Sequence, residues 1–221
     1  MNDTGLTALF AALFVATHFL LSHPLRAPLV GRLGPKGFLG LYSAVAFATF
    51  LLSVYFRHAS GRQAPLWAVP SWGWDVAAVL MLLAAILLVG SFVRNPAVET
   101  LSRPDAAIGP PAGIFRWTRH PMMWSFAIWA GVHLLVNPVP SAIALAVPVA
   151  ILALFGARAQ DAKKEQLLGE RWAAYERATS FVPFGRGFAY PGTTALVGGV
   201  ILWLGATWAH AIPVGLWRWL A

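Results

Sequence analysis

The chain contains no cysteine, and this single absence removes several chemistries. Disulfide bonds, thiolate catalysis and sulfur-ligated metal centres all require a cysteine side chain. Any metal ion bound by this protein must therefore be held by nitrogen or oxygen ligands.

Charge is also scarce, at 11% of the 221 residues, whereas 58% of the residues are hydrophobic. A soluble domain of ordinary composition carries about 25% charged residues. A chain this apolar is expected to lie in a membrane, where only helices of this segment length satisfy their own backbone groups. The segments expected to span the bilayer, most of them near the required ~20 residues, are roughly Gly5–Ser22, Gly37–Phe56, Trp74–Val93, His120–Val136, Pro140–Gly156 and Thr193–Trp217.

We therefore predict an all-α fold, a polytopic membrane helical bundle of about six transmembrane helices. Before the last span, residues 157–179 are charged on one side and apolar on the other, which predicts an amphipathic helix at the cytoplasmic surface. We expect the first span to stay in the protein, because Asp3 stands where a cleaved signal has basic residues. No internal repeat or low-complexity linker interrupts the chain, so residues 1–221 are expected to form a single integral membrane domain.

The distribution of cations predicts an orientation. If the amino terminus faces outside, every lysine and arginine falls in an inner loop except Arg57, Arg62 and Arg218. The inner group includes Arg94 and Arg103. This asymmetry is the positive-inside pattern of a protein in the cell inner (plasma) membrane. The net charge of +8 is therefore assigned to topology and to contact with the anionic headgroups of the lipid bilayer, and we expect no nucleic-acid partner.

The segment Thr118-Arg119-His120-Pro121 places a cation and an imidazole at the start of an apolar helix. Polar groups at this position are costly unless they bind something, so the segment is the first candidate for a functional site.

Depth along the spans limits which histidines can share an ion with His120. His18 lies one turn inside the cytoplasmic end of the first span, at a similar level. His133 is roughly 20 Å farther along the same straight helix, too far to share a metal ion with His120. His18 and His120 can therefore converge if their spans are neighbours, whereas His133 would need a partner such as His210.

Two blocks of residues resemble the NnrU family, and together they cover roughly residues 15–185. In the second half the block is Phe115-Arg116-Trp117-Thr118-Arg119-His120-Pro121, followed by Asp161, Gly169, Trp172, Tyr175, Thr179-Ser180 and Val182-Pro183-Phe184. In the first half it is His18, Arg26-Ala27-Pro28-Leu29, Arg32-Leu33-Gly34, Gly37-Phe38 and Leu41-Tyr42-Ser43. Within the family, the pattern most resembles the zeta-carotene isomerase branch.

The resemblance implies a haem b protein in which histidines hold the iron and a cis double bond of an apolar polyene, such as a carotenoid, is converted to trans. The ligand histidines of the family map onto His18 and His120. Arg26 and Arg119 would then pair with the haem propionates, and Asp161 would orient His120 or pair with Arg119. An electron donor for the haem is also implied.

Two other functions remain open. Gly113, Arg116 and Arg119-His120-Pro121 are also similar to isoprenylcysteine and phospholipid methyltransferases, which hold S-adenosylmethionine. This chain departs from that pattern where a tyrosine is replaced by Met123 and where an acidic pair is replaced by Gln160-Asp161. A third possibility is a non-enzymatic haem accessory or sensor protein linked to nitrite and nitric oxide metabolism, as the name of the wider family implies.

Overall fold

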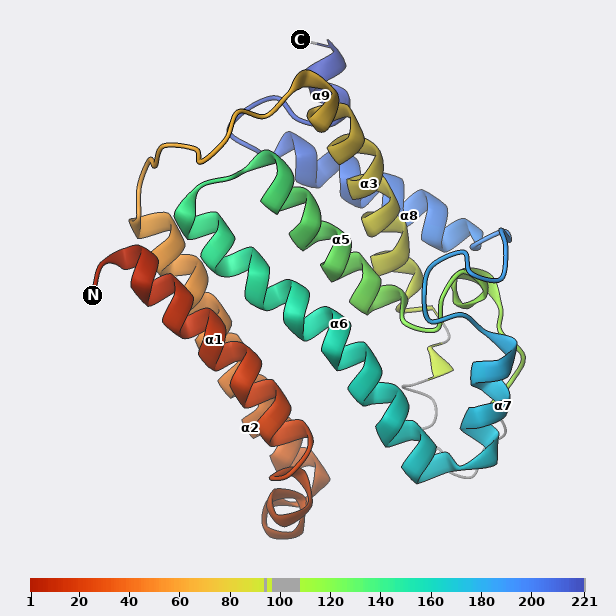
Figure 1. Cartoon of the computed structure of the whole chain (residues 1–221). Coiled ribbons are helices and arrows are strands. Elements are labelled where there is room, and N and C mark those ends of the chain that lie inside the picture. The colour runs from red at the N-terminus through yellow and green to blue at the C-terminus, as the bar shows by residue number, and fades with distance from the viewer. Residues whose placement is uncertain (94, 97–107, 221) are drawn as a thin grey trace. The chain divides into compact units, whose positions relative to one another are not determined.

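The computed structural model describes residues 1–93, 95–96 and 108–220, and the regular secondary structure of these residues is entirely helical (Figure 1). This confirms the predicted all-α class. The chain forms two compact units, Met1–Val69 with His133–Leu152, and Pro70–Val132 with Ala153–Ala221. Arg94 and Arg103, which belong to the predicted inner charges, lie outside the described residues.

The first unit is built on two antiparallel helices, α1 (Asp3–Ser22) and α2 (Arg26–Ala59), which lie side by side in Figure 1. Aromatic side chains pair along their contact. The ring centroids of Phe10 and Phe56 are 5.5 Å apart, and those of Phe14 and Phe50 are 5.3 Å apart. These pairs set the register that brings the carboxyl end of α1 beside the first half of α2.

Helix α2 is interrupted at Gly34, whose φ of 70° and ψ of 168° are not helical. Glycine adopts a positive φ without the steric cost that a Cβ would add. Pro35 follows, and the first helical position after a break tolerates proline because its missing N–H would be unpaired there. The helical chain therefore starts at Arg26, well before the Gly37 expected from hydropathy alone.

Gln63 joins the start of α1 to the start of α6 by hydrogen bonds. Its amide nitrogen donates to Thr4 Oγ1 over 2.8 Å, and its amide oxygen accepts from the Ser141 backbone nitrogen over 2.9 Å. Ser141 lies in the first turn of α6 (Pro140–Leu168), where backbone N–H groups have no partner within the helix. Gln63 therefore caps α6 and ties it to α1.

In the second unit, α3 (Ser71–Gly90) packs against α8 (Thr193–Trp208). Their backbones approach most closely at Gly199, where an added Cβ would lie 2.6 Å from Ile86 Cα. Small residues at such crossings allow the close van der Waals contact that drives helix association in lipid.

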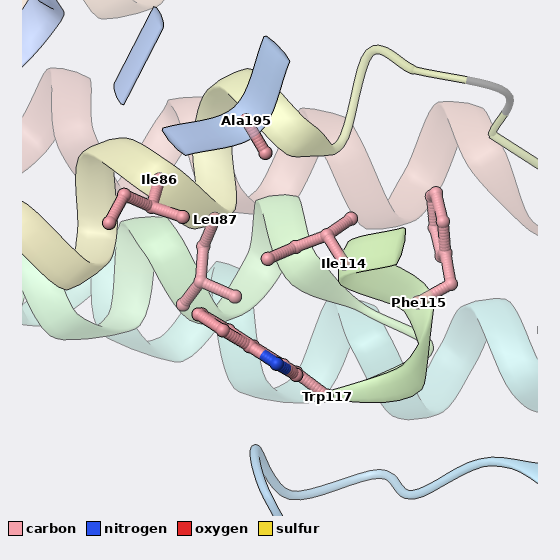
Figure 2. Close-up of a cluster of buried hydrophobic side chains, with 6 residues drawn as sticks. All are labelled: Ile86, Leu87, Ile114, Phe115, Trp117 and Ala195. Atoms are coloured by element: carbon pink, nitrogen blue, oxygen red, sulfur yellow. The ribbon is translucent and has the colours of Figure 1, made fainter. Parts of the chain in front are cut away.

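A buried apolar cluster joins α3 and α8 to the short 3₁₀ helix η1 (Gly113–Arg116) (Figure 2). Figure 2 shows Leu87 of α3 beside the ring of Trp117, and the group also contains Ile86, Ile114, Phe115 and Ala195. Leu87 has no exposed surface, and the Trp117 indole nitrogen donates to the Ala189 carbonyl over 2.6 Å. The cluster anchors the segment that leads directly into the Arg-His-Pro motif.

The predicted amphipathic helix of residues 157–179 is divided between two elements. Residues 157–168 continue α6, since alanine, lysine, glutamate and leucine are strong helix formers and nothing interrupts them. The break comes at Gly169, with a φ of 53°, and α7 (Glu170–Ala178) follows. Within the described residues, the fifth predicted span and the start of the predicted amphipathic helix are thus one continuous helix.

Four of the described helices, α1, α2, α3 and α6, are long and apolar enough to cross a membrane. The other two predicted spans correspond to α5 (Pro121–Val136) and α8, each of 16 residues. Helix α8 ends at Trp208, and Pro213 prevents a helix from continuing to the predicted Trp217. The short α9 (Leu216–Leu220) follows. The count of six spans therefore stays a prediction.

Candidate histidine site

The Arg-His-Pro segment is fixed by hydrogen bonds to the chain that follows α7. Thr118 Oγ1 donates to the Phe181 carbonyl over 2.7 Å, and the Arg119 backbone nitrogen donates to the Ser180 carbonyl over 2.9 Å. Thr118 is fully buried. Because these bonds hold Thr118 and the Arg119 backbone against residues 180 and 181, the side chains at the start of α5 have a defined direction.

Asp161 of α6 joins His120 and Arg119 in one buried network. His120 Nε2 donates to Asp161 Oδ1 over 2.8 Å, and Arg119 donates to Oδ2 from Nε over 2.9 Å and from Nη2 over 2.8 Å. A carboxylate can only accept here, so His120 carries its proton on Nε2. The His120 and Asp161 side chains are only 3% and 11% exposed, and a paired network at this depth holds its geometry strongly.

Glu176 of α7 adds a second carboxylate to Arg119, with 3.3 Å between Oε1 and Nη2. Burial raises the pKa of Glu176, and its hydrogen bond with Glu165 and the charge of Asp161 act in the same direction, while the Arg119 guanidinium lowers that pKa. The net effect is a raised pKa. Arg119 therefore bonds directly to two carboxyl groups, those of Asp161 and Glu176.

Phe181 lies at the centre of the site. Its ring centroid is 5.5 Å from Arg119 Cζ, 6.0 Å from Arg158 Cζ and 5.3 Å from the His120 ring, which meets it edge-on. Its carbonyl also accepts a hydrogen bond from Trp124 Nε1 over 2.7 Å. Guanidinium groups are attracted to aromatic faces, so Phe181 positions two arginines and the histidine together.

His18 is held by a different arrangement on α1. Its Nδ1 donates to the Phe14 carbonyl over 2.8 Å, which leaves the lone pair on Nε2. The half-buried ring makes edge contacts with Phe14 at 4.3 Å and with Tyr42 of α2 at 5.1 Å. Nearby on α2, Arg26 Cζ lies 5.6 Å from the Phe38 ring centroid.

The structure therefore brings three of the predicted site residues, Arg119, His120 and Asp161, into direct contact within the second unit. His18 and Arg26 belong to the first unit, so the pairing of His18 with His120 stays a prediction. Among the described residues, no three histidine, aspartate or glutamate side chains form a group that could hold a metal ion by themselves.

The sequence analysis missed Glu176 and Phe181 as parts of the site. Glu176 lies one residue after Tyr175 of the motif, and Phe181 stands between the Thr179-Ser180 and Val182-Pro183-Phe184 blocks. A charged residue on an amphipathic helix and an aromatic residue in a loop carry no signal of their own. Only their contacts with Arg119 reveal them.

The fold and the site together define an all-helical protein with helices of membrane-spanning length and a buried Arg-His-Asp network at the start of an apolar helix. The family profile described as NnrU protein matches residues 6–218, and the chain belongs to this family. No curated protein and no solved structure matches the chain.

Proposed function

We propose that this protein is a haem b-binding membrane protein, with His18 and His120 as the iron ligands. The observation that carries the proposal is the state of the two imidazole rings. In each ring one nitrogen is committed as a hydrogen-bond donor, His18 Nδ1 to a backbone carbonyl and His120 Nε2 to Asp161. Metal-ligating histidines almost always donate their second nitrogen in this way, to a carbonyl or a carboxylate.

The other ring nitrogen of each histidine suits a metal. His18 Nε2 and His120 Nδ1 make no hydrogen bond within the described part of the chain, and each would present its lone pair to a bound metal. A haem needs only two such axial nitrogens, because the macrocycle supplies the remaining donors.

The proposed pairing of His18 with His120 rests on the sequence. His18 lies in the last turns of α1, which ends at Ser22, and His120 directly precedes α5. Both belong to the cytoplasmic ends of apolar segments under the proposed orientation. Arg26 and Arg119 would then lie near the same membrane surface, where the haem carboxylates would emerge.

Within the network, Asp161 would orient His120 and increase the basicity of its ring. Arg119 would hold Asp161 in place through both guanidinium donors, and Glu176 would fix Arg119 from the side of α7. Bound haem would supply a redox-active Lewis acid at this position. The apolar faces of the surrounding helices would exclude water from it.

We further propose that the reaction is the redox-dependent cis–trans isomerisation of an apolar polyene, with a zeta-carotene as the first candidate. The resemblance of the two motif blocks to the isomerase branch supports this reaction. An electron donor would set the oxidation state of the iron. A haem accessory or sensor protein of nitrite and nitric oxide metabolism is the alternative if haem is present without isomerisation.

The decisive measurement is the absorption spectrum of the purified protein, oxidised and dithionite-reduced. We expect a Soret band and the pyridine haemochrome of haem b. A protein that contains no haem after expression with haem precursors would contradict the proposal and would leave the S-adenosylmethionine-dependent methyltransferase as the function to test, by binding of that cofactor.

Variants then test the ligands. His18→Ala and His120→Ala should each lose haem or shift its spectrum, whereas His58→Ala, an exposed histidine in the last turn of α2, should leave the spectrum unchanged. An unaltered spectrum in either ligand variant would remove that residue as a ligand. Addition of a cis-zeta-carotene to reduced membranes, with product analysis by chromatography, separates the isomerase from the accessory protein.

A further inference from the structure

We propose that Arg158 binds a carboxylate of the cofactor at the His120 site, a haem propionate. This inference rests on the proposed haem binding and adds a residue to it. Arg158 lies on α6, immediately after the uncharged run from Pro140 to Ala157. It is the first cation on this helix, at the edge of its apolar part.

Arg119 is the cation that directly precedes His120 in the chain. Its guanidinium group already bonds to both Asp161 and Glu176. Two carboxylates satisfy most of its donors and its charge, so a third anion would have to displace one of them. Arg119 is therefore placed to hold Asp161 rather than to bind a propionate.

Arg158 differs from Arg119 in its exposure and in its ionic partners. It is exposed, and no carboxylate in the described ranges forms an ion pair with it. Its position is nevertheless defined, because its Cζ lies 6.0 Å from the centroid of the Phe181 ring that also contacts His120 at 5.3 Å. A guanidinium that shares Phe181 with the ligand histidine, and that forms no ion pair with the described residues, can present its planar donors to a carboxylate.

The propionates of haem are attached to one edge of the macrocycle, away from the iron. A propionate partner must therefore lie beside the ligand histidine, at the water-facing rim, and must not touch the metal. Arg158 meets this requirement, because it shares Phe181 with His120 and remains exposed.

The test compares haem with its dimethyl ester, which has the same macrocycle and iron but no carboxylates. The purified full-length protein is loaded with either compound, and the rate of transfer to excess apomyoglobin is measured. We expect Arg158→Gln to speed the loss of haem roughly three- to tenfold, as for one partly exposed charge-assisted pair, and to leave the loss of the ester unchanged. Arg158→Lys should retain much of the wild-type rate.

Arg116→Gln is the matched control, because Arg116 is another exposed arginine of the same unit and is not one of the two guanidiniums beside Phe181. It should change neither rate. Equal losses of haem from wild-type and Arg158→Gln protein would overturn the inference and would be the result for an arginine that binds a phospholipid phosphate instead. An equal acceleration for haem and ester would also overturn it, because the site would then be distorted. A wild-type protein that takes up neither compound refutes haem binding itself.

Discussion

His120 and Asp161 are 41 residues apart in the chain and meet through a 2.8 Å contact between Nε2 and Oδ1. The same carboxylate accepts two further hydrogen bonds from Arg119. Asp161 is thus the residue on which the direction of both motif side chains depends. Its position on α6, beyond the apolar part of that helix, links α6 to the motif at the start of α5.

Asp161→Asn should strongly destabilise the protein. The substitution keeps the shape of the side chain and removes the charge, so Arg119 retains only Glu176 as an ionic partner. Loss of one partner from a buried ion pair costs about 3–5 kcal/mol. We expect this decrease in the free energy of unfolding, measured by denaturant titration in mixed micelles.

The control for this measurement is Glu170→Gln on α7. Glu170 pairs with Arg177 over 3.1 Å, but the two side chains are 83% and 68% exposed. Exposed ion pairs contribute less than about 1 kcal/mol. If both substitutions had the same small effect, the Asp161 network would not be a stabilising element of the fold.

Gly199→Ala should weaken the packing of α3 against α8. A Cβ at this position would lie 2.6 Å from Ile86 Cα and 2.8 Å from its backbone nitrogen, and neither atom can move without shifting the helix. We expect a loss of about 1–3 kcal/mol, as for overpacking in a close-packed interior, seen as a lower unfolding temperature in detergent.

Gly205→Ala, on the same helix, gives the matched comparison. An added Cβ there meets nothing within 4 Å, so the substitution should be neutral or slightly stabilising through helix propensity. Wild-type stability in Gly199→Ala would show that the two helices do not approach as closely as described.

Glu176→Gln should change how stability depends on pH. The pKa of Glu176 is raised in the folded protein, chiefly by burial, so its carboxyl group binds a proton more tightly there than in the unfolded chain. The resulting stabilisation is complete below the ordinary pKa of glutamate and is lost as the pH rises through the raised folded value. The variant lacks this pH-dependent loss.

We therefore expect the unfolding temperature of Glu176→Gln, relative to wild type, to increase as the pH rises from acidic to neutral values. Thermal unfolding followed by circular dichroism over a pH series measures this difference, and Glu170→Gln serves as the exposed control. A difference that is constant with pH, or that decreases, would contradict the raised pKa.

The all-helical class and the start or end of most helices could be read from the sequence, because hydropathy and glycine or proline breaks are local properties. Pro140 begins α6 as predicted, and α1 and α3 closely follow their apolar segments. The less accurate boundaries have local causes too. Helix α2 starts early because the chain is helical on both sides of Gly34, and α6 runs past its apolar part because helix formers continue it.

The residues Arg119, His120 and Asp161 could be singled out from the sequence, since a cation and an imidazole at the mouth of an apolar helix are costly and the motif contains a later aspartate. The sequence could not determine whether Asp161 binds His120 or Arg119. Tertiary structure decided that it binds both, with Glu176 as a second carboxylate on Arg119 and Phe181 beside both motif residues. These contacts join α5, α6, α7 and the segment after α7. They depend on how the helices pack together, which the hydrophobic periodicity of a single helix does not determine.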